Sequence, residues 1–68
     1  MSLYRLGDKS PRVPEDVFVA PGATIVGDVE IGRHASVWFA SVIRADTEVI
    51  AIGDETNIQD GCVLHTDE

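Results

Sequence analysis

The chain has few basic residues and a marked excess of acidic ones, which excludes several kinds of partner. Only 5 of its 68 residues are Lys or Arg, against 12 Asp and Glu, so the net charge is −7. Nucleic acids and anionic membrane surfaces are bound by clustered basic side chains, and no such cluster occurs here. We therefore expect no nucleic-acid partner and no membrane partner.

Long apolar runs and paired cysteines are also missing. The longest strongly apolar run, residues 17–20, is far shorter than the ~20 residues that cross a bilayer. No apolar segment follows residues 1–5, as it would in a secretion signal. The single cysteine, Cys62, cannot form an internal disulfide, which fits a reducing compartment. These features predict a cytoplasmic protein.

What the chain does contain is an aliphatic residue at every sixth position. A helix repeats its apolar face near every 3.6 residues and a lone strand every 2, so a period of six requires a coil with flat sides and sharp corners. The series runs through Val13, Val19, Ile25, Ile31, Val37 and Ile43, and resumes after a slip at Ile52, Ile58 and Leu64. Three sides close a coil of about 18 residues, and stacked coils pair their backbones in parallel.

Smaller residues accompany this series at the expected corners. Four residues after the aliphatic positions come Ala23, Val29, Ala35, Ser41, Thr47, Thr56 and Cys62, which we interpret as inward-facing. Cys62 is accordingly assigned to the core and not to a reactive thiolate. Between them lie Gly22, Gly27, Gly32, Gly53 and Gly61, which we expect to provide positive φ angles or close backbone approach.

The slip sets the register of the later coils. It lies between Ile43 and Ile52, and we expect residues 47–51 to bulge out as a short loop. Stacked positions across the slip then lie 21 residues apart instead of 18. The pairs predicted in this way are Val37 with Ile58, Ile43 with Leu64, Arg44 with His65, Asp46 with Asp67 and Trp38 with Gln59. Arg44 and His65 should thus share one outward column.

The two ends of the chain are predicted differently. Residues 1–14 form a leader or cap, with the alternative that residues 3–6 pair as an edge strand. The chain stops directly after a repeat, without the polar cap that solenoids need. We therefore expect residues 1–68 to be one domain of about three coils that forms the front part of a longer one. The exposed rung at residues 63–68 should seek a partner backbone.

Three large side chains fall outside the inward positions of the repeat. Trp38 and Phe39 should point outward, where they form a partner surface or are covered by the leader. His34 follows Gly32 at a turn and is interpreted as an exposed imidazole without a ligand role.

The six-residue period resembles the hexapeptide repeat of left-handed β-helix proteins, and the local motifs resemble the gamma-class carbonic anhydrase branch of that group. Its relatives are also described as ferripyochelin-binding or carnitine-operon-type proteins. The motifs are Ser36-Val37-Trp38, Ile43-Arg44-Ala45-Asp46, Ile52-Gly53, Asn57-Ile58-Gln59-Asp60-Gly61 and Val63-Leu64-His65. The resemblance implies an all-β, single-stranded left-handed parallel β-helix that forms a homotrimer. It also implies zinc, with iron and cobalt as alternatives, shared between subunits.

The same resemblance gives roles to individual residues. His65 would be a zinc ligand, and Arg44 and Asp46 would form an ion pair between subunits beside the metal. Gln59 would orient metal-bound hydroxide or bicarbonate, and Asp60 would brace the Arg44 region. Zinc lowers the pKa of bound water to about 7, which permits attack on carbon dioxide to give bicarbonate. Catalytic zinc takes three protein ligands, and the resemblance places two of them in later coils, so we expect the isolated chain to be inactive.

The sequence departs from the family pattern at the proton relay. Glu68 matches the position of a proton-transfer glutamate, but Thr47 stands where the prototype has its other acid, and Glu48 is the nearest substitute. Ala45 also replaces the glycine that commonly separates the arginine and the aspartate. These departures affect the expected turnover more than the expected metal binding.

Two other functions remain open at this point. Many hexapeptide-repeat proteins transfer acyl groups from coenzyme A, and His65 is suited to act as the general base of that reaction. A non-catalytic trimeric scaffold is the second alternative. On residue types alone, an exposed column of one histidine, one arginine and several acids is more often a solvated face than a site.

Overall fold

The computed structural model of the chain describes residues 2–66, and every regular element among them is a β-strand. The strands are β1 (Ser2–Tyr4), β2 (Phe18–Val19), β3 (Thr24–Ile31), β4 (Ser36–Val37), β5 (Val42–Ile52), β6 (Asn57–Ile58) and β7 (Val63–His65). They form a four-stranded sheet, β1-β3-β5-β7, and a three-stranded sheet, β2-β4-β6, in which all neighbours are parallel. Within the described residues, no helix is long and apolar enough to cross a membrane.

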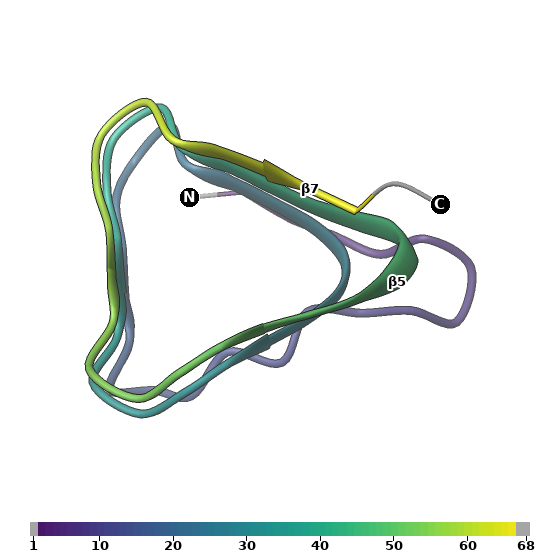
Figure 1. The fold of residues 1–68 in the computed structure, drawn as a ribbon, viewed down its shortest axis with the longest axis horizontal. Helices are drawn as coiled ribbons and strands as arrows, with labels where there is room; N and C mark the ends of the chain where they lie inside the picture. Colours follow the sequence, from purple (N-terminus) through teal and green to yellow (C-terminus); the bar gives the residue numbers. More distant parts are fainter. Residues whose placement is uncertain (1, 67–68) are drawn as a thin grey trace.

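The chain winds as a three-sided coil (Figure 1). Wall 1 holds β1, the first halves of β3 and β5, and β7. Wall 2 holds the second halves of β3 and β5, which bend around a shared corner, and wall 3 holds β2, β4 and β6. In Figure 1 the chain turns clockwise as it approaches the viewer, which makes the coil left-handed. The predicted left-handed parallel β-helix is confirmed.

The stacking register agrees with the prediction. On wall 3, Val19 pairs with Val37 and Val37 pairs with Ile58. On wall 1, Ile43 lies between Ile25 and Leu64 in the same manner. The change of spacing from 18 to 21 residues is therefore present, and it keeps the aliphatic column facing the interior across the slip.

The position of the slip was predicted wrongly. Ala45 pairs with Gly27 and Ile50 already pairs with Val29, so residues 46–49 stand opposite the single residue Asp28. The three extra residues therefore lie within 46–49 and not within 47–51. Thr47, expected at the inward small position, is exposed. The reason is that wall 2 requires an aliphatic side chain over Val29, and Ile50 packs against the core there. We call residues 46–49 the bulge.

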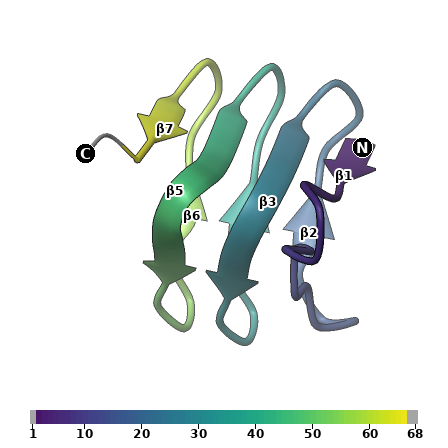
Figure 2. The ribbon, with the colours of Figure 1, turned by 90° about the vertical axis from the view of Figure 1, so that its right-hand side faces the viewer.

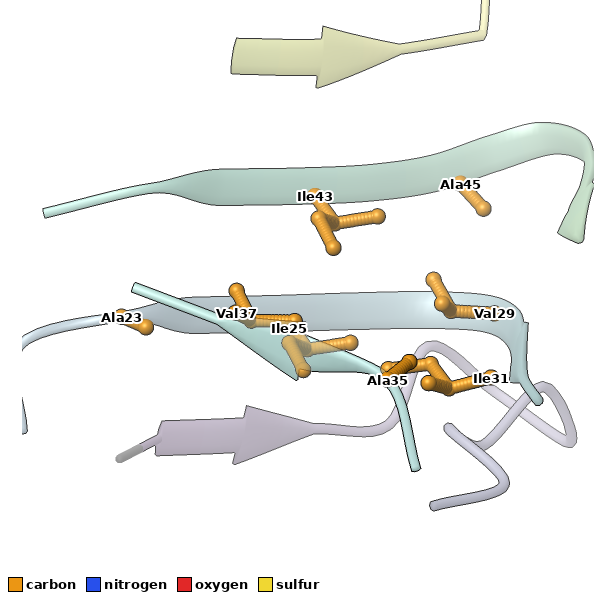
Figure 3. Close-up of a cluster of buried hydrophobic side chains, with 8 residues drawn as sticks. All are labelled: Ala23, Ile25, Val29, Ile31, Ala35, Val37, Ile43 and Ala45. Atoms are coloured by element: carbon orange, nitrogen blue, oxygen red, sulfur yellow. The ribbon is translucent and has the colours of Figure 1, made fainter. Parts of the chain in front are cut away.

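The core fills the middle of the coil (Figure 3). Its buried members are Ala23, Ile25, Val29, Ile31, Ala35, Val37, Ile43 and Ala45, with Ile50, Ile52, Ile58 and Leu64 partly buried against them. Ser41 is also buried, and its hydroxyl donates to the Gln59 carbonyl at 2.6 Å. Cys62 is half-buried on the last coil, so its expected place in the core is only partly reached.

The leader follows the strand alternative in part. Residues 2–4 form β1, which pairs in parallel with the start of β3 on wall 1. A tight turn then brings Leu6 and Lys9 together, and Arg12 forms an isolated bridge to Glu30 on wall 2. The leader thus adds partial pairing beneath walls 1 and 2 (Figure 2).

Glycine is required at some corners and not at others. Gly22, Gly27 and Gly61 have φ values of 83°, 87° and 73°, in the left-handed region that favours glycine. Gly32 instead permits close approach, because a Cβ there would overlap the Asp54 side chain. Gly53 needs neither, since a Cβ would lie 3.5 Å from its nearest neighbour, so the expectation for Gly53 was wrong.

We expect Gly27→Ala to destabilise the protein strongly, because a Cβ at this corner would overlap the Ala45 carbonyl oxygen on the next coil. Left-handed strain of ~1–2 kcal/mol together with overpacking of ~1–3 kcal/mol gives a loss of about 2–5 kcal/mol in the free energy of unfolding. Gly7→Ala is the matched control, because Gly7 also has positive φ but nothing within 4 Å of its Cβ position. Urea unfolding of both variants measures the difference, and equal losses would contradict the proposed clash.

Candidate functional site

Wall 1 brings Arg44 and His65 together on its outer face. The two residues are direct partners in the β5–β7 ladder, which Figure 2 shows at one edge of the coil. Because Ile43 and Ala45 point into the core, the residue between them points outward. An Arg44 guanidinium nitrogen, Nη2, lies 2.6 Å from His65 Nε2. The predicted shared column is confirmed.

Asp46 completes this group from the start of the bulge. Its Oδ2 lies 3.6 Å from Arg44 Nε, and its Oδ1 lies 3.7 Å from His65 Nε2. The side chains of Arg44, Asp46 and His65 are 50%, 37% and 39% exposed, so water screens these contacts. We call these three residues the wall 1 cluster.

The environment of Asp46 favours its charged form. Partial burial acts to raise its pKa. Hydrogen bonds from the Thr66 hydroxyl and the Asp46 backbone, the charge of Arg44 and, when the imidazole is protonated, the charge of His65 lower the pKa by more than burial raises it. The net result is a pKa below the ordinary value. Asp46 is therefore a carboxylate at neutral pH and an effective partner for the guanidinium.

The contact with Arg44 fixes the tautomer of His65. A guanidinium can only donate hydrogen bonds, so His65 Nε2 must accept and the ring proton must sit on Nδ1. The Nε2 lone pair is thereby used within the chain. A metal ion could take this nitrogen only if Arg44 released it.

The described residues do not form a metal site by themselves. No group of three His, Cys, Asp or Glu side chains comes together anywhere in residues 2–66. No pocket is found in the same part of the chain, so the wall 1 cluster lies on an open face. The role of His65 as a metal ligand stays a prediction, and a catalytic metal bound there would need further ligands from outside the described residues.

Gln59 and Asp60 lie apart from the wall 1 cluster. Gln59 directly follows β6 on wall 3, and Asp60 lies in the turn that leads to wall 1. No side-chain hydrogen bond or ion pair within residues 2–66 joins either of them to Arg44, Asp46 or His65. The expected bracing of Arg44 by Asp60 does not occur within one chain.

Of the two residues expected to relay protons, Glu48 lies within the described residues and Glu68 does not. Glu48 is exposed in the bulge, where its backbone N–H lies 3.5 Å from the Thr66 hydroxyl. Glu68, and Asp67 as the expected partner of Asp46, fall outside the described residues. Thr66 was not singled out from the sequence, although it follows His65 directly and its hydroxyl lies 3.2 Å from Asp46 Oδ1.

The outward aromatics form a cluster on wall 3. The rings of Phe18 and Trp38 are 4.9 Å apart, and those of Trp38 and Phe39 are 6.3 Å apart. Phe18 and Phe39 are 46% and 47% exposed, and β1 of the leader pairs on wall 1 instead. Phe39 is therefore not covered by the leader, whereas Trp38 is half-buried and contacts Phe18. A partner surface stays a prediction.

His34 is at a corner turn, as predicted. It has a φ of 59° and an exposed side chain, and its Nδ1 lies 3.5 Å from Asp16 Oδ2. Arg33 Nε approaches the same oxygen at 3.5 Å. This corner joins walls 2 and 3 and is separate from the wall 1 cluster.

The sequence of the chain is similar to those of several carbonic anhydrases. The chain is 48% identical over 64 residues to the mitochondrial gamma carbonic anhydrase 2 of Arabidopsis thaliana, and 43% identical over 63 residues to a carbonic anhydrase of Geobacillus kaustophilus. These alignments cover 94% and 93% of this chain. The chain belongs to the gamma-class carbonic anhydrase-like family. It spans only 23% and 35% of the lengths of these two members of the family.

A solved structure gives the same fold. A Bacillus cereus protein, whose crystal structure is described as that of a candidate acetyltransferase, superimposes with a TM-score of 0.86 at 34% identity. The match covers 94% of this chain and 43% of that one. No protein-family model matches the chain. Since family members include proteins named as mitochondrial, the cytoplasmic location stays a prediction.

We expect nitrogen NMR at neutral pH to show His65 with a protonated Nδ1 and an unprotonated Nε2, because Arg44 donates to Nε2. Arg44→Met should shift His65 toward the Nε2-protonated tautomer, in which Nε2 can donate to Asp46. His34 is the internal reference and should not change. A wild-type His65 protonated mainly on Nε2 would contradict the proposed contact.

Proposed function

We propose that the protein is a gamma-carbonic-anhydrase-like enzyme that interconverts carbon dioxide and bicarbonate at a zinc site shared between the subunits of a homotrimer. The observation that carries this proposal is the wall 1 cluster, in which the strand register places Arg44 beside His65 and the bulge adds Asp46. The names of the homologous carbonic anhydrases support it.

In the proposed reaction, zinc would activate the water molecule, and the residues of the chain would bind zinc and bicarbonate. Zinc, when bound, makes a water molecule acidic enough to react with carbon dioxide at neutral pH. His65 would be one ligand, through a neutral imidazole nitrogen. Arg44 would then give up His65 Nε2 and form the expected ion pair with Asp46 of a neighbouring subunit, in place of the contact within the chain, in which Asp46 Oδ2 lies 3.6 Å from Arg44 Nε. A guanidinium held in this way also presents positive charge to bicarbonate.

A shared site explains the separation of the remaining residues. Gln59 and Asp60 lie toward wall 3 of the same chain, so they would reach a site at His65 most directly from a neighbouring subunit. Wall 1 of one subunit would face wall 3 of the next, and such a contact closes into a ring under three-fold rotation. Gln59 would then orient the reacting oxygen, and Asp60 would brace Arg44 across the interface.

Proton release is assigned to Glu48 in the bulge and to Glu68. A carboxylate that faces solvent can pass a proton from the site to buffer. Glu48 is exposed in the bulge, two residues after Asp46. It would serve together with or in place of Glu68.

Acyl transfer is the second candidate, favoured by the similarity to the candidate acetyltransferase. In that reaction His65 Nε2 would act as general base. Against it, the basic residues are largely committed to carboxylates, which leaves little charge for coenzyme phosphates. Arg12 contacts Asp28, Arg33 contacts Asp16 and Arg44 contacts Asp46. A trimeric scaffold without catalysis is the third reading of the same fold.

We expect the protein expressed from its natural gene to purify with stoichiometric zinc and to hydrate carbon dioxide in a stopped-flow assay. His65→Ala should weaken zinc binding by more than the ~10–100-fold typical for loss of a residue that only supports a ligand. His34→Ala is the matched control and should retain both zinc and activity, because His34 is at another corner.

Each other result favours a different function. A zinc-free protein that transfers acyl groups with dependence on His65 would establish the acyltransferase. A zinc-free protein with neither activity would support the third candidate, a non-catalytic trimeric scaffold. Elemental analysis and the two assays on the same preparation therefore separate the three candidates.

A further inference from the structure

Thr66 is the centre of a hydrogen-bond group that links His65 to the bulge. Its hydroxyl lies 3.2 Å from Asp46 Oδ1, 3.1 Å from the Thr47 hydroxyl and 3.3 Å from the Thr47 backbone nitrogen. A fourth and longer contact joins it to the Glu48 nitrogen at 3.5 Å. The Thr66 backbone N–H also donates to the Arg44 carbonyl at 3.2 Å.

The donor and acceptor roles in this group follow from its chemistry. A carboxylate can only accept, so the one hydroxyl proton of Thr66 goes to Asp46. The two lone pairs then accept from the Thr47 hydroxyl and from the backbone N–H groups of Thr47 and, at longer distance, Glu48. Every hydrogen-bonding position of the Thr66 hydroxyl is therefore used.

The bulge needs such an acceptor. The β3–β5 ladder has no paired residues between Ala45 and Ile50, so the N–H groups of Thr47 and Glu48 lie outside its register. Unpaired backbone donors and a free carboxylate would let residues 46–49 adopt many conformations. Thr66 supplies from the next coil the contacts that the ladder does not provide.

We propose that Thr66 is a positioning residue, which holds Asp46 between Arg44 and His65 by fixing the bulge from the following coil. The same Asp46 oxygen that accepts from Thr66 faces His65 Nε2 at 3.7 Å, so the hydroxyl sets where the carboxylate stands relative to the imidazole. This inference deepens the proposed function and rests on it only for its effect on zinc.

The test compares Thr66→Val, which keeps the shape and loses the hydroxyl, with Thr66→Ser, which keeps the hydroxyl. Thr56→Val, at the corner between walls 2 and 3, controls for loss of a threonine hydroxyl elsewhere. In the valine variant, amide hydrogen exchange at Thr47 and Glu48 should be at least about tenfold faster. The NMR signals of Arg44 Nε–H and the His65 ring should also shift. Thr66→Ser and Thr56→Val should match the wild type.

Zinc affinity then distinguishes positioning from simple support of the fold. Thr66→Val should weaken zinc binding ~10–100-fold, as expected when a residue that orients a ligand is lost, and Thr66→Ser should restore it. Unchanged Arg44 and His65 signals in the valine variant would overturn the inference, as would unchanged zinc affinity in a protein that binds zinc. If the wild type binds no zinc, the proposed function fails, and the NMR comparison still decides the role of Thr66.

Discussion

The structure depends on one stack of inward aliphatic side chains held by parallel backbone pairing. Ile25, Ile43 and Leu64 occupy equivalent places on three successive strands of wall 1. Once they face the interior, strand alternation turns the next residue of each strand outward. Arg44 and His65 meet for this reason, so the pairing of these two members of the cluster is a consequence of core packing and of register, whereas Asp46 is added by the bulge.

Much of the fold could be predicted because the coil repeats a local rule. Ile31, Val37 and Ile43 are each six residues apart, and that spacing fixes walls, register and outward columns together. The position of the slip could be predicted less accurately than the walls and the register. Counting four residues from Ile43 selects Thr47, but packing over Val29 selects the larger Ile50, and only the three-dimensional contact decides between them.

The candidate site was predictable to the extent that it follows the ladder. Arg44 and His65 are ladder partners, whereas Asp60 and Gln59 lie across a corner, where a rule for stacking gives no contact. Thr66 was missed for a different reason. Its hydroxyl contacts residues of the bulge, and the bulge leaves the repeat, so periodicity carries no information about its partners.

The bulge also shows how this architecture accepts change. Pairing is interrupted after Ala45 and regained at Ile50, and the coil beyond keeps its interior in phase. Additional length at this corner would leave the solenoid outward and alter the contacts of the bulge with Thr66, but the ladders on either side would keep their register. The remaining energetic penalty is that of closing a short loop. This corner is thus a position where segments of other lengths could alter the rim of the face that carries the wall 1 cluster, while the coil beneath stays the same.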